Sequence, residues 1–317
     1  MLDCCLHCHQ PLESAEEKKQ GWHHRCVRAF FSSDKLPDID LSTANIESFA
    51  RASIGEKRSI SGVQKKISFG FEKSQKGNSQ RLTLTNFPTG YILKPPAESY
   101  PEMTLSEETT MAMADLCHFR TVPHSLIRLH DGGLAYICKR VDRTKGHSLP
   151  MEDFCQLSGK MTSNKYVGSY EQIGKLILQH SSMPGEDLVR LFQIVLFCFL
   201  TGNSDMHLKN FSLLGEEASS MRLSPFYDLL PVDLFFQDEE MLALTLDGRK
   251  NKISIKHFNA FAETLGLSNK VRDGLIQDLL SKKDLLLKTI QDSLLSSSFK
   301  KRYCDLLNTR FTTLLLK

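Results

Sequence analysis

The sequence predicts an α+β fold made of two lobes, a small β-rich lobe followed by a larger helical lobe. Two observations carry this prediction. Short runs rich in β-branched and aromatic residues occupy the first half of the chain, between Gly, Pro, Asn and Asp. After residue 150, leucine, isoleucine and phenylalanine recur at helical spacing instead. A cleft between two such lobes is where a ligand is expected to bind.

The individual elements follow from the same patterns. Five segments are predicted to be strands: KKISFGF, RLTLT, GYILK, SLIRLH and GLAYICK. A helix from about Leu105 to Phe119 interrupts them. In the second half, EDLVRLFQIVLFCFL predicts a buried helix because it is apolar nearly all round. Further helices are predicted over 255–266, 270–293 and 299–316.

Three regions are therefore expected along the chain. A Cys/His-rich N-terminal cap occupies residues 1–30, and a β-rich lobe with a phosphate loop occupies residues 31–145. The remainder, residues 146–317, is predicted to be an all-helical lobe that carries the catalytic loop.

Composition narrows the class of protein. The chain has 317 residues, 41% of them hydrophobic, which is enough for a sizeable core. A net charge of +3 gives no strong reason to expect a nucleic-acid-binding surface. The longest apolar run, Leu191 to Leu200, is too short to span a membrane and contains Gln193. The nine cysteines mostly stand alone in apolar runs, so a cytoplasmic protein is expected, with secretion without a cleaved signal left open.

The stretch GNSDMHLKNFSLL places several chemically capable side chains directly after the buried helix. Asp205 and Asn210 are five residues apart in it. A carboxylate can accept the proton of an attacking hydroxyl, and an amide oxygen five residues later can help to hold a metal ion. Protein kinases use this Asp-x4-Asn pairing in their catalytic loop. The alternative is a turn in which both side chains only bond to their own backbone.

Two further segments fit the same chemistry. In SPFYDLLP, Asp228 follows Asn210 by eighteen residues, where a kinase keeps its metal-binding aspartate, although no Phe-Gly follows it here. In YILKPP, Lys94 ends a strand of the small lobe, where a kinase places its phosphate-binding lysine. Glu108 on the next helix is a candidate partner for Lys94. Glu107 competes for that role, and spacing alone does not separate the two.

A flexible loop, RSISGVQKKISFG, precedes the first strand. Its backbone N–H groups could wrap phosphates, although one glycine, Gly62, makes a weak phosphate-loop signal. Lys65 and Lys66 add positive charge, and Ser59 and Ser61 add hydroxyl groups.

Six segments in order resemble the HipA family of bacterial serine/threonine protein kinases, which are toxins of toxin–antitoxin systems. They are SISGVQKKIS, YILKPP, ICKRVDR, EDFCQLSG, GNSDMHLKNFSLL and SPFYDLLP, and they cover roughly residues 59 to 231. The resemblance implies a two-lobed protein-kinase-like fold, the use of ATP and Mg²⁺, and a protein substrate. It is to a short, HipT-like form, because only 58 residues precede Ser59 and leave no room for the further N-terminal subdomain of larger relatives.

The resemblance also implies roles for particular residues. Asp205 would be the catalytic base, and Asn210 and Asp228 would hold magnesium. Ser59 would be autophosphorylated, and Ser61 is the second candidate for this modification. The nucleotide would be contacted by the covering loop, by Lys94 and Glu108, by backbone groups of the hinge, and by residues near the catalytic loop: Ser61, Gly62, Val63, Gln64, Lys65, Lys66, Lys139, Arg140, Val141, His207, Lys209 and Tyr227.

The same resemblance implies partners. A translation protein such as an aminoacyl-tRNA synthetase is the expected class of substrate. A separate small, antitoxin-like protein is expected to supply the missing subdomain, and a DNA-binding antitoxin could complete the complex. No direct contact with nucleic acid or with a membrane is expected.

The cap contains two pairs of soft metal ligands. Cys5 and Cys8 form a C-x2-C pair, and His23 and Cys26 form an H-x2-C pair. Four such ligands in two pairs suit tetrahedral zinc. The ligand set stays open at this point, because further candidates lie nearby: Cys4, His7, His9 and His24. A small Cys/His turn that packs without metal is the alternative.

Two rival functions share the main features. One is a small-molecule kinase of kinase-like fold, such as an aminoglycoside phosphotransferase, and SGVQKK and EDFCQLSG favour the HipA-like alternative over it. The other is a nucleotide-binding pseudokinase. The presence of Asp205, Asn210, Asp228 and Lys94 argues against lost catalysis.

Overall fold

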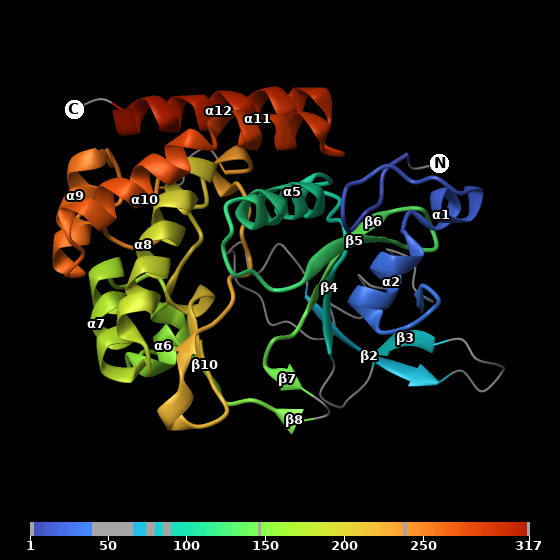
Figure 1. The fold of residues 1–317 in the computed structure, drawn as a ribbon, viewed down its shortest axis with the longest axis horizontal. Coiled ribbons are helices and arrows are strands. Elements are labelled where there is room, and N and C mark those ends of the chain that lie inside the picture. Colours follow the sequence, from blue (N-terminus) through green and yellow to red (C-terminus); the bar gives the residue numbers. More distant parts are fainter. Residues whose placement is uncertain are drawn as a thin grey trace. The chain divides into compact units, whose positions relative to one another are not determined.

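The computed structural model describes residues 3–39, 66–73, 80–84, 90–144, 147–236 and 240–315. The chain divides into two compact units, whose elements are coloured along the sequence in Figure 1. The first unit is Met1–Glu108 with Val122–Ser148, and the second is Thr109–Thr121 with Leu149–Lys317. Helix α5 (Met103–Leu116) contributes residues to both units.

Within the described ranges, the first unit is built on a six-stranded sheet in the order β1-β3-β2-β4-β6-β5. Neighbouring strands are antiparallel, except that β1 and β3 are parallel. The strands are β1 (Asp38–Ile39), β2 (Ile67–Lys73), β3 (Gln80–Leu84), β4 (Tyr91–Lys94), β5 (His124–Arg128) and β6 (Leu134–Lys139). Each of the five predicted strands is therefore confirmed, whereas the two-residue β1 was not predicted.

The N-terminal cap, residues 3–31, packs its own small core. Ser14 caps α1 (Ala15–Gln20) in a capping box with Glu17, and Gly21 ends the helix with a left-handed φ of 78°. The second helix, α2 (His24–Phe31), buries Phe30 and Phe31 against Trp22, which is itself completely buried. Aromatic packing of this kind gives a short segment a defined structure.

The helix predicted from about Leu105 to Phe119 is α5, and it ends three residues earlier than predicted. His118 has a φ of 60°, in the left-handed region, which stops the helix. A hairpin of β7 (Arg143–Thr144) and β8 (His147–Ser148) precedes the second unit.

Helices dominate the second unit, and α8 is their common packing partner. The α8 helix (Pro184–Thr201) contacts α7, α9, α10 and α12 in its own unit, as Figure 1 shows. Most of its side chains from Leu188 to Thr201 are buried, which confirms the predicted buried helix. The other helices are α6 (Phe154–Leu157), α7 (Tyr170–His180), α9 (Ile255–Thr264), α10 (Asn269–Ser281), α11 (Lys283–Asp292) and α12 (Ser297–Leu315).

One predicted helix, over 270–293, is two helices in the structure. The backbone at Lys282 leaves the helical region, with φ −87° and ψ 2°, so α10 ends there and α11 begins.

Among the described residues, no helix is both long and apolar enough to cross a membrane.

The prediction of an all-helical second lobe is wrong in one respect. The described part of this unit contains a three-stranded antiparallel sheet of β9 (Met151–Asp153), β10 (Ser212–Leu214) and β11 (Arg222–Leu223). Strands of two or three residues are too short to show the alternating pattern by which a strand is predicted. Single 3₁₀ turns complete the unit: η1 (Thr162–Asn164), η2 (Leu208–Asn210), η3 (Ala218–Ser220) and η4 (Val232–Leu234).

Candidate functional site

The loop with Asp205 begins where α8 ends, at Gly202. This glycine has a left-handed φ of 70°, and a Cβ atom there would lie 2.6 Å from a methyl carbon of Leu306. Only glycine meets both constraints without strain. The sharp turn sends the chain away from the buried helix, and the polar residues that follow are consequently held by a rigid element.

Asp205 and Asn210 are both buried and are linked to each other. The side-chain amide of Asn210 donates a hydrogen bond of 2.8 Å to the backbone oxygen of Asp205. The backbone N–H of Asp205 donates to Oδ1 of Asn203, at 3.1 Å. The alternative prediction was a turn whose side chains bond to their own backbone, and it is correct for the amide nitrogen of Asn210. The amide oxygen of Asn210 is a ligand of the type that magnesium prefers.

The Asp205 carboxylate is oriented by a residue that sequence reasoning missed. The hydroxyl of Tyr166 donates a hydrogen bond to Oδ1 of Asp205. His207 lies on the same side, with Nε2 4.0 Å from Oδ1 and its ring edge-on to Tyr166 at 5.0 Å. Tyr166 lies 39 residues before Asp205 in a stretch with no catalytic pattern, so spacing could not have identified it.

Asp228 has an unusual backbone conformation for a residue other than glycine. Its φ is 58°, in the left-handed region, which costs about 1–2 kcal/mol. The side-chain amide of Asn203 donates to the backbone oxygen of Asp228, at 3.3 Å. Asn203 therefore joins the backbones of Asp205 and Asp228 through the two ends of one amide. Backbone strain of this kind clusters at functional sites.

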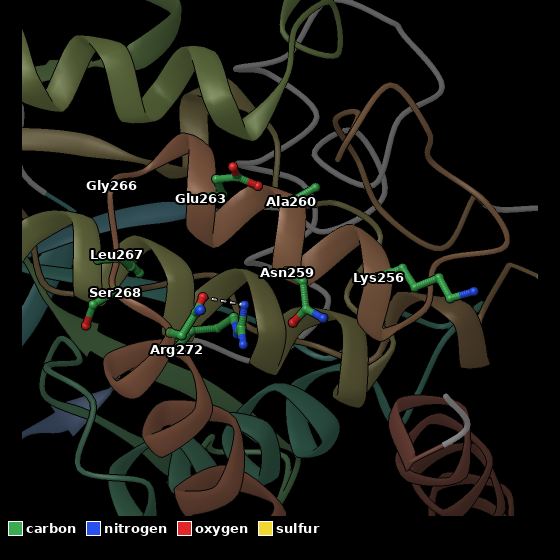
Figure 2. Close-up of a pocket in the computed structure, with 9 residues that line it drawn as sticks. Lys256, Asn259, Ala260, Glu263, Gly266, Leu267, Ser268 and Arg272 are labelled. Atoms are coloured by element: carbon green, nitrogen blue, oxygen red, sulfur yellow. Dashed lines mark hydrogen bonds between the residues drawn. The ribbon is translucent and has the colours of Figure 1, made fainter.

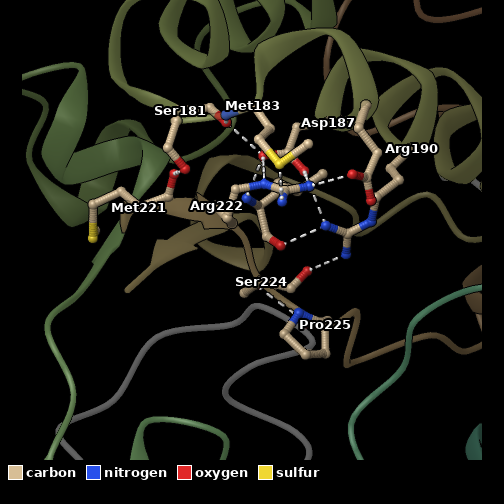
Figure 3. A network of polar contacts seen from close by, with 11 residues as sticks. Ser181, Met183, Asp187, Arg190, Met221, Arg222, Ser224 and Pro225 are labelled. Carbon is tan, nitrogen blue, oxygen red and sulfur yellow. Dashed lines mark hydrogen bonds and ion pairs between the residues drawn. The ribbon is translucent and has the colours of Figure 1, made fainter. Parts of the chain in front are cut away.

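A buried ion-pair network fixes the strand that leads to Asp228 (Figure 3). Asp187, on the first turn of α8, has no exposed surface. Its carboxylate accepts hydrogen bonds from the Ser181 hydroxyl at 2.6 Å and the Leu223 N–H at 2.8 Å. Arg190 and Arg222 also donate to it, at 3.1 to 3.2 Å. The network thus ties α8 to β11, five residues before Asp228.

Replacing Asp187 with asparagine should lower the free energy of unfolding by about 2 kcal/mol at pH 7, because hydrogen bonds to a charged acceptor are lost. Burial acts to raise the pKa of Asp187, but hydrogen bonds from Arg222 and Ser181 hold it below its usual range. The charged form therefore stabilises the fold above the pKa of the unfolded chain, and this contribution is lost as the pH falls through the folded pKa. Urea unfolding at pH 7 and at successively lower pH measures both effects.

The matched control for this variant is Asp284→Asn, the same change at an exposed aspartate in the first turn of α11. It should lower the free energy of unfolding by less than about 1 kcal/mol, the usual contribution of an exposed acidic side chain at a helix N-terminus. Equal stability of the Asp187→Asn and Asp284→Asn proteins at pH 7 would contradict the role given to the network.

Two residues predicted to contact the nucleotide have other partners in the structure. The Lys209 ammonium lies 2.6 Å from Oδ2 of Asp153, and its contact with phosphate stays a prediction. Asp153 also caps α6 in a capping box with Gln156, which gives the EDFCQLSG segment a structural role. The Tyr227 hydroxyl bonds to the Ser212 hydroxyl at 2.8 Å.

In the first unit, Lys94 forms a buried ion pair with Glu107. Both side chains are almost completely buried, at 2% and 0% exposure, and the ammonium also lies 5.2 Å from the centre of the Tyr136 ring. Of the two candidates that spacing left open, Glu107 is thus the partner of Lys94. Glu108 instead lies 2.8 Å from Nδ1 of His124.

The charge of Glu108 is held by its histidine neighbours. Burial acts to raise the pKa of this carboxyl, but His124 and His9 outweigh it and lower the pKa to about 2. His9 contributes from the cap, with Nε2 3.4 Å from Oε1 of Glu108. Adjacent glutamates on α5 thus serve different partners.

The predicted hinge is engaged inside its own unit. The backbone N–H groups of Lys139 and Arg140 donate to the oxygens of Pro123 and Gly90, at 2.8 and 2.9 Å. Both N–H groups are therefore engaged within their own unit, and a contact of this backbone with an adenine ring stays a prediction. The Arg140 guanidinium pairs with Asp142. The expected contacts of Val141 and of the hinge carbonyl groups with the nucleotide also remain predictions.

Most of the predicted phosphate loop lies outside the described residues. This applies to the two serines and to the stretch before the first strand: Ser59, Ser61, Gly62, Val63, Gln64 and Lys65. Lys66, directly before β2, is described and exposed.

A surface hollow between α9 and α10 is separate from these residues (Figure 2). Lys256, Glu263 and Arg272 are among the side chains that line it, and Arg272 donates to Asn269 at 3.0 Å. None of the predicted site residues lines this hollow, and we assign it no chemistry.

Comparison with known proteins adds a family match. The model of the HipA-like C-terminal domain matches residues 58–284. "Putative kinase Y4dM" of Sinorhizobium fredii is 31% identical over 224 residues, which are 65% of this chain and 54% of that protein. "Serine/threonine-protein kinase toxin HipA" of Shewanella oneidensis is 27% identical over 237 residues, which are 66% of this chain and 52% of that protein. The matches span about half the length of these two relatives.

A solved structure supports the fold. The chain of Shewanella oneidensis HipA, determined in a complex of HipA, HipB and operator DNA, has a TM-score of 0.68 and 23% identity. The match covers 87% of this chain and 71% of that one. The prediction of an α+β, protein-kinase-like fold is therefore confirmed.

Proposed function

The chain belongs to the HipA-like C-terminal domain family, and on that premise we propose that it is an ATP-dependent serine/threonine protein kinase. The observation that carries the proposal is the hydrogen-bonded arrangement of buried Asp205 and Asn210 with partly buried Asp228, which Asn203 joins to Asp205. Phosphoryl transfer depends mainly on positioning and charge neutralisation. An amide that joins the backbones of Asp205 and Asp228 provides such positioning.

The proposed reaction uses a small set of side chains. Asp205 accepts the proton of a substrate hydroxyl as its oxygen attacks the γ-phosphorus of ATP. The bond between this phosphorus and the bridging oxygen breaks, and ADP leaves. Tyr166 orients the Asp205 carboxylate. Lys94, fixed by Glu107, contacts the nucleotide phosphates.

The oxygen ligands fit magnesium. An amide oxygen of Asn210 and the carboxylate of Asp228 are of the type that Mg²⁺ prefers, and both belong to one unit. When bound, the ion would supply positive charge for the β- and γ-phosphates.

Incubation of the purified chain with ATP and Mg²⁺ tests this function. Intact-mass measurement should show added phosphate, and peptide mapping should place it in the loop that contains Ser59 and Ser61. A phosphate there adds nearly two negative charges and should lower the affinity for ATP. An Asp205→Asn protein that is expressed, purified and incubated in the same way should carry no phosphate. Equal phosphorylation of that variant would mean that another kinase is responsible.

The class of acceptor is tested by offering radiolabelled ATP with either a bacterial lysate or a panel of aminoglycosides. We propose that label enters a protein of the translation machinery, such as an aminoacyl-tRNA synthetase, as part of a toxin role. Label on an aminoglycoside would indicate a small-molecule kinase. Nucleotide binding without transfer in either arm would indicate a pseudokinase.

A DNA-binding antitoxin is the proposed partner. The support is that the similar Shewanella structure is a complex with HipB and operator DNA. Affinity purification of the tagged Asp205→Asn protein from its host should recover such a partner. Recovery of the chain alone would count against it.

A further inference from the structure

Four potential metal ligands come together in the cap. The nearest ligand atoms of Cys5, Cys8, His23 and Cys26 all lie within 4.8 Å of one another. Ligand atoms around a tetrahedral zinc ion are about 3.5–3.8 Å apart, given Zn–S and Zn–N distances near 2.3 and 2.1 Å. The three cysteines are free thiols, and all four residues except Cys8 are buried.

The local backbone presents the ligands from two directions. The first pair lies on a tight turn, in which the Cys5 N–H donates to Gln10 at 2.8 Å and the His9 N–H donates to Cys5 at 3.0 Å. The second pair lies at the start of α2, where His23 precedes the helix and Cys26 occupies its first turn. The turn faces the start of the helix, so the two pairs of ligands can meet at one ion although 14 residues separate them in the sequence.

The ring of His23 is fixed in the orientation that a metal ligand needs. Its Nε2 bonds to the backbone oxygen of Pro11 at 2.9 Å, so Nε2 carries the proton. Its Nδ1, which then has a free lone pair, lies 3.3 Å from Sγ of Cys8 and 3.9 Å from Sγ of Cys26. Metal-binding histidines characteristically donate their other ring N–H to a carbonyl or a carboxylate.

The other four candidate ligands are exposed or have other partners, and they lie outside the group of four. Cys4 is exposed, and His24 lies 3.7 Å from Glu16. The His7 ring bonds to the backbone of His124 and stacks on Trp22, and His9 contacts Glu108.

The cap is bonded to the sheet of its own unit on both sides of the cluster. The Leu6 oxygen, between the first two ligands, accepts hydrogen bonds from the Ser125 hydroxyl at 2.9 Å and the Leu126 N–H at 3.4 Å. Beyond the second pair, the Phe30 oxygen accepts one from the Tyr91 hydroxyl, at 3.3 Å. An ion at the cluster would therefore hold together the two segments that dock on β5 and β4.

We propose that Cys5, Cys8, His23 and Cys26 bind one structural Zn²⁺ ion, which closes the cap and fixes it on strands β4 and β5. A closed shell of four protein ligands leaves no position for substrate, so the role is structural. The proposal is independent of the kinase function, because its readouts are metal content and cap structure.

The first experiment measures zinc in protein purified without a polyhistidine tag. About one equivalent per chain is expected. Replacement by Co²⁺ should give the absorption bands of tetrahedral thiolate coordination. Less than about a tenth of an equivalent after growth with zinc, or an intact mass showing a disulfide within Cys5, Cys8 and Cys26, would overturn the proposal.

A built-in fluorophore reports on the cap. Trp22 is the one tryptophan of the chain and is completely buried beside α2. Chelation should therefore shift its emission to longer wavelength, and added Zn²⁺ should reverse the shift. Removal of bound zinc with no change in Trp22 emission would mean that the ion lies elsewhere, which would overturn the assignment.

A pair of neighbouring cysteines provides the matched variants. Cys8→Ser, at a partly exposed ligand, should weaken zinc binding at least about tenfold. Cys4→Ser, at the exposed cysteine outside the cluster, should bind zinc as the wild type does. Equal loss in both variants, or in neither, would contradict the ligand set. If Cys8→Ser does not fold, chelation and reconstitution of the wild type decide the question.

Discussion

Phosphotransfer by the Asp205→Asn protein should be at least about a hundredfold slower than that of the wild type, because general base catalysis contributes about 10²–10⁴ in rate. An amide cannot accept the proton of the attacking hydroxyl. It keeps the shape of the carboxylate and an oxygen that can accept the hydrogen bond from Tyr166. The melting temperature and the ATP affinity should therefore change little. Initial rates at saturating ATP, with thermal unfolding in parallel, measure both quantities.

The exposed Asp284→Asn change serves as the control, since it alters the same functional group away from the catalytic loop. It should retain full activity. A rate for Asp205→Asn within tenfold of the wild type, about 1.4 kcal/mol in the barrier, is too mild for a catalytic base. That result would mean that another residue is the catalytic base.

The parts of the site that follow from continuous sequence could be predicted. The α8 helix is long and almost entirely apolar, and Gly202 ends it, so the position of the Asp205 loop follows from local pattern alone. The strands that carry Lys94 and the hinge are bounded by clear turn residues. The buried core elements that carry the chemistry therefore have strong local signals.

The parts that depend on tertiary contacts could not be predicted. Successive helix residues differ by about 100° in direction, so Glu107 and Glu108 must face different neighbours. Which of them meets Lys94 depends on how α5 lies on the sheet. The bridge made by Asn203 likewise joins segments 25 residues apart. The pairing of Lys209 with Asp153 spans 56 residues, so it also left no local signal.

Replacing Glu107 with glutamine should lower the free energy of unfolding by about 3–5 kcal/mol, the cost of breaking a buried ion pair. Lys94 and Glu107 are buried together, so the neutral amide removes the opposite charge that Glu107 supplies to the ammonium in a low-dielectric site. Phosphotransfer should fall as well, because the Glu107 carboxylate then no longer fixes the direction of Lys94. Urea unfolding and initial phosphotransfer rates at pH 7 measure the two effects.

The neighbouring Glu108→Gln change is the matched comparison, since it removes the same charge one residue further along the same buried helix. It breaks the pairs with His124 and His9 and leaves Lys94 with Glu107, so phosphotransfer should stay within about tenfold of the wild type. The folded pKa of Glu108, about 2, lies below that of the unfolded chain. Its charge therefore stabilises the wild type above the unfolded pKa, and this contribution is lost as the pH falls through the folded value. The difference in stability between the wild type and Glu108→Gln should consequently shrink in acid. If Glu108→Gln abolished phosphotransfer and Glu107→Gln did not, the assignment of Glu107 as the partner of Lys94 would be wrong.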